Sequence, residues 1–407
     1  MRSIVWLMGL LAVPQGPVPE YAPDDQPRTL LVVSAPLYRP ALEPWLQRRQ
    51  RQRYRVELID PAETIGDSRG PEVVERLREE IARHVPDGGG RAVHPNADAV
   101  PAAFVLLVGD APGPTEPLDT RRLIPTAIQT EKARPSAPHR FASDNVYGLP
   151  DERGVPRLAV GRWPVRSPEE AAMQVRKSLR YETDQRPGLH RSTFTFLATT
   201  PNYDPVLDPV LEKVAMTMLG SQLGPHWGIR ALYSSPRSEF FPGPEETARH
   251  VVRWLEDATP VTLFAGHGFD CGVDVVRFEG REFCVLDAQL ATTIQGDRPG
   301  TLLWMSTCSC GAFALPPPER GLAESLMMNP RGPTAVVAGS DETSAYANTL
   351  LCLGLAQVIE RPPDTLGQAV LRCKQALSQP GPGWLKKLLL SLEPTEKPDH
   401  LPEDHHH

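Results

Sequence analysis

Two reactive side chains follow strongly apolar stretches in the second half of the sequence. His267 lies between two glycines directly after residues 261–265, and Cys308 follows residues 301–306 with only Thr307 between them. Continuous apolar runs are typical of strands covered on both faces of a parallel sheet, and ligands bind beyond the carboxyl ends of such strands. If the two strands are neighbours, the imidazole and the thiol therefore meet at one sheet edge.

A thiol near an imidazole can act as a nucleophile, because the base favours the reactive thiolate. Gly268 allows the backbone to approach a substrate closely, and its N–H can donate to a developing oxyanion. The pair indicates a cysteine nucleophile with a histidine acid/base. Two structural alternatives stay open: a cysteine beside a Trp-Met strand is often a small core side chain, and a histidine between glycines can simply form a turn.

A metal centre is the competing interpretation of this region. Five metal-binding side chains are close in sequence: His267, Cys271, Cys284, Cys308 and Cys310. Their spacing does not fit the tight C-x-x-C pairs that structural zinc sites usually show. A Cys308–Cys310 disulfide is a further alternative, but the ring that a C-x-C bridge closes is small and strained. The spacing therefore favours thiol chemistry over zinc.

Apolar runs that alternate with amphipathic segments predict the elements that position these residues. Strands are expected at 29–35, 54–60, 103–110, 158–162, 194–200, 230–235, 261–265, 301–306 and 334–339. Helices are expected at 40–52, 71–84, 167–182, 208–223 and 245–256. Strands separated by helices of this length imply βαβ units and a mainly parallel sheet.

The alternation divides the chain into two side-by-side α/β subdomains. The first is expected over 28–188 in a supporting role, and the second, over 189–382, contains the predicted catalytic pair. An N-terminal extension covers 1–27, and a proline-rich C-terminal tail covers 383–407. A chain of 407 residues is long enough for two such cores without help from disulfides or metals.

The composition narrows the class of protein. Apolar residues make up 40% and charged residues 23%, and the formal charge is −7, which is typical of a globular protein and argues against a nucleic-acid partner. The basic cluster at 48–55 is interpreted as a solvated helix end. No run reaches the roughly 18–20 apolar residues that span a bilayer. The oligomeric state is not indicated.

The N-terminus has features of an export signal. Arg2 precedes an apolar core at 4–13 and a proline-containing stretch, but a clear small-x-small cleavage site is absent. The pattern favours a secreted or periplasmic protein, and the alternative is a segment docked on the fold. All six cysteines lie in the last third of the chain, which argues against a disulfide scaffold.

The motifs around the reactive pair have a family resemblance. A strand ending in His267-Gly268, then a strand followed by Cys308-Ser-Cys-Gly311-Ala-Phe313, is similar to the gingipain-type family of caspase-like (clan CD) cysteine peptidases. Further segments follow the family's order: 103–110, 143–148, 160–162, 181–182, 321–327 and 332–340. The resemblance covers roughly residues 28–360.

The resemblance implies a caspase-like fold of two α/β subdomains with mainly parallel sheets flanked by helices. It also implies endopeptidase activity through a thioester on Cys308, with His267 protonating the leaving amine. The N–H groups of Gly268 and Cys308 would form the oxyanion hole. A catalytically inactive relative that serves as a scaffold or binding module is the alternative function.

The expected substrate is a protein or peptide, with a preference for Arg or Lys before the cleaved bond. Arg-cleaving gingipains have an acid at the position similar to Asp208, and a carboxylate there would pair with a basic side chain; alternatively, Asp208 is only a helix N-cap. Ser340 and Asp341, together with Glu342, Thr343 and Ser344, would form the facing pocket wall, or a solvated loop. The family's histidine-supporting acid corresponds to Asn202 here.

No cofactor is required for this chemistry. The resemblance allows calcium as a structural ion, although no EF-hand-like loop is present in the sequence. Removal of a pro-segment as the activating event is doubtful, because only about 27 residues precede the first expected strand.

Overall fold

Parallel sheets form the framework of the structure, a computed structural model that describes residues 28–85, 103–131, 139–184, 188–199, 220, 223–235, 238–298, 300–360, 363 and 365–377. The strands are β1 (Thr29–Ser34), β2 (Arg55–Ile59), β3 (Ala103–Val108), β4 (Ala127–Glu131), β5 (His139–Ser143), β6 (Ala159–Trp163), β7 (Thr193–Ala198), β8 (Gly228–Tyr233), β9 (Val261–Ala265), β10 (Gly268–Phe269), β11 (Gly272–Phe278), β12 (Arg281–Asp287), β13 (Leu302–Ser306) and β14 (Ala335–Ala338).

Helices connect these strands. The α-helices are α2 (Arg39–Arg51), α3 (Pro61–Ile65), α4 (Glu72–His84), α5 (Pro168–Thr183), α7 (Pro244–Glu256), α8 (Ala288–Ala291), α9 (Leu322–Met328), α10 (Ala345–Glu360) and α11 (Leu366–Ala376). Short 3-10 turns are η1 (Pro36–Tyr38), η2 (Asn145–Gly148) and η3 (Leu189–Ser192).

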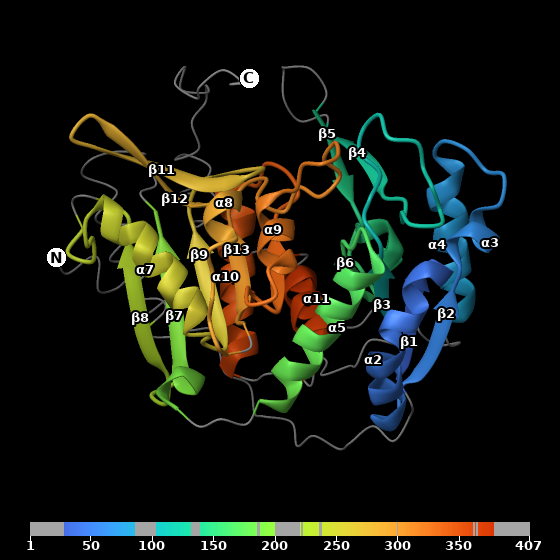
Figure 1. The fold of residues 1–407 in the computed structure, drawn as a ribbon, viewed down its shortest axis with the longest axis horizontal. Coiled ribbons are helices and arrows are strands. Elements are labelled where there is room, and N and C mark those ends of the chain that lie inside the picture. The colour runs from blue at the N-terminus through green and yellow to red at the C-terminus, as the bar shows by residue number, and fades with distance from the viewer. Residues whose placement is uncertain are drawn as a thin grey trace.

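Two parallel sheets lie side by side (Figure 1). The first has the strand order β2-β1-β3-β6, and the second has the order β14-β13-β9-β7-β8. All pairings within these two sheets are parallel. Two antiparallel units complete the described structure: the β4–β5 pair and the three-stranded β10-β11-β12 sheet. The predicted fold of mainly parallel sheets flanked by helices is confirmed.

The first sheet is buried on both faces, which explains its continuous apolar sequence. Every residue of β1 is buried. Tyr38, Leu42 and Trp45, from η1 and α2, pack on one face together with α5. Leu77 and Ile81, from α4, pack on the opposite face. The predicted amphipathic pattern of residues 71–84 therefore corresponds to a helix that buries one stripe against the sheet.

The second sheet is also covered on both faces. Val251 and Leu255 of α7 pack with Phe264 and Met305 on one face, where α9 and the β11–β12 hairpin also contribute side chains. Leu355 and other residues of α10, with Cys373 of α11, cover the opposite face. Strands β9 and β13 lie inside this sheet, so their carboxyl ends are held in fixed register.

Helix α5 joins the two sheets. It begins where the sequence predicts, because the Ser167 side chain accepts from the N–H of Glu170 at 3.3 Å and Pro168 occupies the first turn. Its buried Lys177 ammonium donates to the carbonyls of Met327 at 2.6 Å and Asn329 at 3.0 Å, which end α9. Figure 1 shows α5 between the two sheets.

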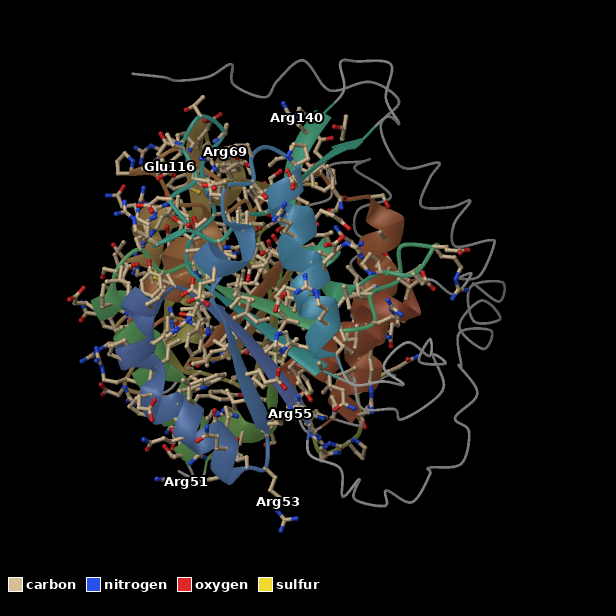
Figure 2. All side chains as sticks on the ribbon, turned by 90° about the vertical axis from the view of Figure 1, so that its right-hand side faces the viewer. Arg51, Arg53, Arg55, Arg69, Glu116 and Arg140 are labelled. Carbon is tan, nitrogen blue, oxygen red and sulfur yellow. The ribbon has the colours of Figure 1, made fainter. Side chains whose placement is uncertain are left out.

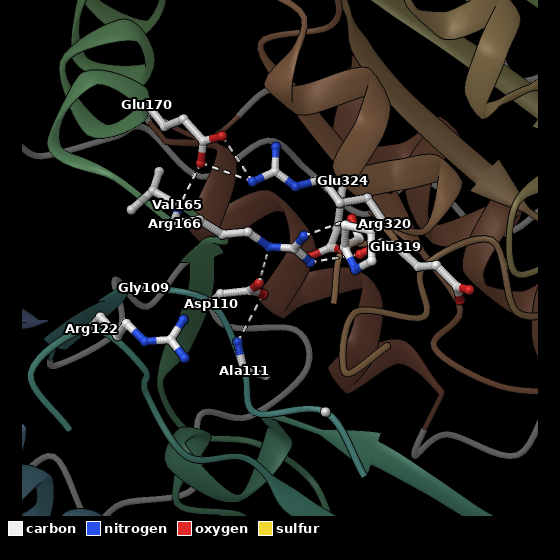
Figure 3. A network of polar contacts seen from close by, with 12 residues as sticks. Gly109, Asp110, Ala111, Arg122, Val165, Arg166, Glu170, Glu319, Arg320 and Glu324 are labelled. Atoms are coloured by element: carbon white, nitrogen blue, oxygen red, sulfur yellow. Dashed lines mark hydrogen bonds and ion pairs between the residues drawn. The ribbon is translucent and has the colours of Figure 1, made fainter. Parts of the chain in front are cut away.

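A second polar connection lies at the start of α9 (Figure 3). Arg166 pairs with Asp110 beyond the end of β3 and donates to the carbonyls of Pro318 at 3.0 Å and Glu319 at 2.7 Å. Arg320 donates to both carboxyl oxygens of Glu170 at 2.9 Å. Charged side chains that follow β3 and β6, or begin α5, thus fix the segment that leads into α9.

The basic cluster of residues 48–55 is partly neutralised. Arg48 and Arg49 both pair with Glu182, and Arg55 pairs with Glu57. Figure 2 shows Arg51, Arg53 and Arg55 at one end of the molecule, remote from Arg69, Glu116 and Arg140. The cluster therefore fits its interpretation as a solvated helix end. None of the helices in the described residues is long and apolar enough to cross a membrane.

Candidate active site

Strands β9 and β13 are adjacent, so the loops that follow them share one sheet edge. Ala265 lies opposite Ser306 in the parallel register, and the N–H of Gly266 donates to the carbonyl of Ser306 at 3.3 Å. His267 and Cys308 each come two residues after this pair. The structure therefore brings the two predicted residues together at the edge where the sequence places them.

The turn after β13 holds Cys308 in a constrained backbone. Ser309 has a positive φ of 51°, a conformation that non-glycine residues seldom adopt. The N–H of Ser309 donates to the carbonyl of Asp341 at 3.0 Å, and that of Gly311 donates to Gly339 at 2.8 Å. Within the described part of the chain, the Cys308 N–H makes no hydrogen bond. Among the described residues, none occupies that amide, so it is open to a ligand there.

Cys308 and Cys310 occupy different environments. Cys308 is half-buried, whereas Cys310 is fully buried and donates to the carbonyl of Gly272 at 3.4 Å. Burial raises the pKa of the Cys310 thiol to about 12. Because the thiolate is the reactive form, Cys310 is a poor nucleophile, and the two sulfurs are free thiols in the structure.

The loop after β14 contacts the Cys308 sulfur. The N–H of Thr343 donates to Sγ at 3.4 Å, and the Thr343 hydroxyl lies 3.6 Å from the same atom. Asn348 donates to that hydroxyl at 2.8 Å and so fixes its orientation. Hydrogen bonds to the charged form of a group favour that form. The N–H and hydroxyl of Thr343 can therefore donate to a thiolate, and the Thr343 carbonyl, 3.7 Å from Sγ, accepts from the protonated thiol.

Two glycines around His267 are required by close packing. A Cβ on Gly266 would lie 1.8 Å from the Thr199 hydroxyl oxygen, and a Cβ on Gly268 would lie 2.5 Å from the Cys308 carbonyl oxygen. The Gly-His-Gly sequence thus allows the histidine turn to lie against both β7 and the cysteine turn. His267 itself is exposed.

The predicted substrate-binding residues differ in what the structure describes. Ser340 is half-buried and Asp341 is buried, and their loop contacts the cysteine turn through the Ser309–Asp341 hydrogen bond. Asp208 and Asn202 lie outside the described residues. The structure thus brings Ser340 and Asp341 to the site. The role of Asp208 in substrate binding stays a prediction from the sequence.

The cysteines and histidine of the competing metal interpretation do not gather. Within the described ranges, no group of three or more His, Cys, Asp or Glu side chains is arranged to hold a metal ion. Burial raises the pKa of Cys284 to about 11 and also raises that of Cys271, which disfavours the thiolates that zinc requires. These residues do not fit a zinc centre.

Thr343, which the sequence places only in the expected pocket wall, contacts the Cys308 sulfur. Asp274, which the sequence does not single out, lies beside the histidine turn. Asp274 lies in the β10–β11–β12 sheet, which was not predicted from the sequence. Its N–H donates to the carbonyl of His267 at 3.3 Å. Alternating apolar residues around Asp274 were the available signal for this hairpin.

Known proteins resemble this chain in sequence pattern and in fold. A model of peptidase family C25 matches residues 22–395. The crystal structure of the Arg specific cysteine proteinase gingipain R (RgpB) aligns with a TM-score of 0.61 and 16% identity, covering 88% of this chain and 74% of that one. A complex of Porphyromonas gingivalis RgpB pro- and mature domains aligns with a TM-score of 0.58 and 16% identity, covering 86% and 76%.

The comparison with curated proteins found no match. The structural likeness at this identity supports the fold, and the family match spans most of the chain. Cysteine peptidases cleave peptide bonds, so the substrates are proteins or peptides. The chain belongs to peptidase family C25, the gingipain family of clan CD, and is a cysteine-type peptidase.

Proposed function

We propose that this peptidase is an endopeptidase in which Cys308 is the nucleophile and His267 is the general acid and base. The observation that carries the proposal is the register of β9 and β13, which places the two residues at equivalent positions beyond paired strand ends. The half-buried Cys308, with donors from Thr343, is the better nucleophile of the two neighbouring thiols.

The reaction follows from these positions. The Cys308 thiolate attacks the scissile carbonyl carbon, a C–S bond forms, and the carbonyl oxygen becomes an oxyanion. The C–N bond then breaks as His267 gives its proton to the leaving amine, which leaves a thioester. Water, deprotonated by His267, attacks the thioester carbon, and the C–S bond breaks to release the carboxylic acid and the thiolate.

The oxyanion hole is assigned to the backbone N–H groups of Cys308 and Gly268. The Cys308 amide makes no hydrogen bond within the described residues, and Gly268 lies directly against the cysteine turn. Backbone donors fixed in advance stabilise charge that develops in the transition state without reorganising. Both amides come from loops that the paired strands hold in place.

Cleavage after Arg or Lys is the proposed specificity. Asp208 would pair with the basic side chain, and Ser340 with Asp341 would line the facing wall. Support comes from the loop that holds Ser340 and Asp341, which touches the cysteine turn, and from the similar structure described as Arg specific. A carboxylate in a pocket favours a guanidinium because bidentate pairs are strong and directional.

The test is cleavage of a fluorogenic peptide library by the wild type and the variants Cys308→Ala, Cys310→Ala and Asp208→Asn, with and without calcium. We expect cleavage after Arg and Lys by the wild type. Cys308→Ala loses more than about 1,000-fold of kcat/KM, as removal of a nucleophile does, and Cys310→Ala keeps most of it. Asp208→Asn loses cleavage after basic residues more than after others.

Each outcome separates one part of the proposal from another. Cleavage after a different residue keeps the mechanism and overturns the assigned pocket. Loss of activity in Cys310→Ala but not in Cys308→Ala would show that Cys310, and not Cys308, is the nucleophile. No cleavage of any peptide in any condition, with Cys308 inert to alkylation, favours a family member that has become a scaffold.

A further inference from the structure

The histidine turn and the hairpin that follows it are joined by an antiparallel ladder. Gly268 lies opposite Val273, and the next bond of the ladder runs from the Asp274 N–H to the His267 carbonyl at 3.3 Å. His267 and Asp274 are therefore cross-strand neighbours, although seven positions separate them in the sequence. Side chains of directly opposed residues on antiparallel strands lie within interaction distance.

A buried hydroxyl connects the same two residues. Thr199, which follows β7 and is only 2% exposed, accepts from the His267 N–H at 3.4 Å. The Thr199 side chain also hydrogen-bonds the Asp274 carboxyl. Because a hydroxyl has one proton to donate and lone pairs to accept, Thr199 can satisfy both partners at once. The contact fixes the carboxyl relative to the histidine turn.

The Asp274 backbone is constrained at this point. Its φ is 36°, in the region that residues with a side chain seldom occupy, while its neighbour Val273 is fully buried. Non-glycine residues persist in such conformations when their surroundings over-determine them. The constraint, the ladder and the Thr199 contact together hold the carboxyl beside the His267 turn.

The electrostatics agree with this placement. Burial raises the pKa of the Asp274 carboxyl, and the charge of the nearby His267 imidazole opposes that rise. The Cys284 thiol of β12 also lies near the carboxyl, and burial raises its pKa to about 11. A thiol with that pKa is neutral near pH 7, so the His267 imidazole is the group among these that can carry a positive charge beside Asp274.

We propose that Asp274 is the positioning carboxylate of the active site, which orients the His267 ring and stabilises its protonated form. The inference rests on the proposed role of His267. A carboxylate in this position fixes the tautomer of a catalytic histidine and stabilises the imidazolium that donates to the leaving amine. Here the hairpin beyond the histidine supplies the acid, whereas Asn202, at the position of the family's supporting acid, has no carboxylate to offer.

The first test follows the His267 ring by NMR in histidine-labelled protein, with its resonance assigned by its loss in His267→Ala. In Asp274→Asn, we expect the titration midpoint of that ring to move down by about one pH unit, since an opposite charge within a few ångströms stabilises the protonated form by at least that much. Glu279→Gln removes an exposed charge from the turn of the same hairpin, and we expect no shift.

The second test compares pH profiles of kcat/KM. In Asp274→Asn, kcat falls on the order of 100-fold with little change in KM, the scale of a general acid–base contribution, and the alkaline limb moves to lower pH. Thr199→Val keeps the Asp274 carboxyl but removes the hydroxyl that holds it. We therefore expect the titration midpoint of the His267 ring to fall by less than in Asp274→Asn. Glu279→Gln keeps the wild-type profile.

The outcomes keep this inference distinct from the proposed mechanism. If His267→Ala abolishes cleavage while Asp274→Asn moves neither the ring titration nor the alkaline limb, the Asp274 assignment is wrong and the Cys–His mechanism stands. If His267→Ala cleaves normally, the mechanism itself fails. If Asp274→Asn does not fold, Thr199→Val decides: an unmoved titration overturns the assignment.

Discussion

At the residue scale, reactivity depends on which donors surround a thiol. Cys308 has the N–H of Thr343 at 3.4 Å and its hydroxyl at 3.6 Å. Cys310, two residues on, donates to a carbonyl in a fully buried position. Each thiol can donate to a carbonyl, but Cys308 also has two donors and is only half-buried. Burial opposes the thiolate of Cys310 more strongly, so the two side chains differ in reactivity.

Replacing Thr343 by Val should slow the reaction of Cys308 with iodoacetamide at pH 7 by about threefold to tenfold, since one neutral hydrogen bond contributes about 1 kcal/mol. Thr343→Ser keeps the hydroxyl and is the matched control, for which we expect a near wild-type rate. Quenching the alkylation at a series of times, followed by peptide mass spectrometry, measures the alkylation rate of each cysteine. Equal rates in the Val and Ser variants would show that the hydroxyl does not stabilise the thiolate.

The reactive pair could be predicted from residue types, but its partners could not. His267 and Cys308 each stand beside glycines after an apolar strand, a pattern visible in the sequence. Asp274, seven positions from His267, becomes its partner through a hairpin that only the alternating apolar residues of β11 indicate. Thr199 becomes a partner only through the pairing of β7 with β9, which brings residues 68 positions apart into contact. Pairing of that range depends on the whole sheet and leaves no local signal.

At the element scale, the histidine and cysteine turns are packed with no spare volume. A Cβ on Gly268 would lie 2.4 Å from Cys310 Sγ and 2.5 Å from the Cys308 carbonyl oxygen. Separations below about 3 Å force atoms to move, and the second of these atoms belongs to the backbone of the cysteine turn. The glycine therefore sets the distance between the histidine turn and the cysteine turn.

Gly268→Ala should displace the cysteine turn and lower kcat/KM by at least about tenfold, because small misplacements of catalytic groups are costly. Overpacking should also destabilise the protein by about 1–3 kcal/mol. Gly161→Ala, in β6, has open space at its Cβ and is the control. Steady-state kinetics measures the effect on kcat/KM, and urea unfolding measures the effect on stability. A wild-type kcat/KM for Gly268→Ala would contradict the packing argument.

Apolar strands were the elements best predicted from the sequence. Residues 261–265 form β9 as expected, and the runs at 29–35 and 301–306 form β1 and β13 within one residue at each end. The β11–β12 hairpin was not predicted. Its turn has positive φ at Glu279 and Gly280, 50° and 74°, which fits a tight hairpin turn whose Glu-Gly sequence is a weaker signal than Asn-Gly or Asp-Gly.

At the scale of the whole molecule, the first sheet is connected to the active site through α9. The N–H of Leu322 donates to the carbonyl of Asp270 at 2.8 Å, and that of Ala323 donates to the carbonyl of Cys310 at 3.0 Å. Arg166 and Glu170 hold the segment before α9 from the other side, and Glu170 does so by accepting from Arg320 (Figure 3). The first subdomain thus supports the site through the N-terminus of α9.

Glu324 makes this junction sensitive to pH. Burial, with a further contribution from the Asp110 carboxylate, raises the pKa of Glu324 from 4.5 to about 8. The folded protein therefore binds a proton there that the unfolded chain has lost, and the stability from this group falls as pH rises between about 4.5 and 8. Glu324→Gln removes the titration and keeps an oxygen to accept from Gly321.

We expect Glu324→Gln to equal the wild type in stability near pH 5 and to exceed it at pH 9. Urea unfolding at both pH values measures the difference. Glu319→Gln, an exposed neighbour in the same segment, is the control and should follow the wild type at both. A Glu324→Gln variant that is less stable than the wild type at pH 9 would contradict a protonated, buried Glu324.

The arrangement of the two sheets could be predicted only in outline. Alternating strands and helices imply two parallel sheets, but contacts such as Lys177 with Met327 join residues 150 positions apart. In the sequence, the side chains that make those contacts cannot be distinguished from the surface charges of an ordinary amphipathic helix. The network around Asp110 and Arg166 has the same origin, because it forms only when both sheets are in place.

The central claim is that Cys308 forms the covalent intermediate. The most direct measurement is intact and peptide mass spectrometry after treatment with an Arg-containing peptidyl chloromethyl ketone, with Cys308→Ala and His267→Ala in parallel. We expect one adduct on Cys308 in the wild type, none in Cys308→Ala and a much slower reaction in His267→Ala. An adduct on Cys310 or on an exposed thiol such as Cys271, with Cys308 unmodified, would contradict the account.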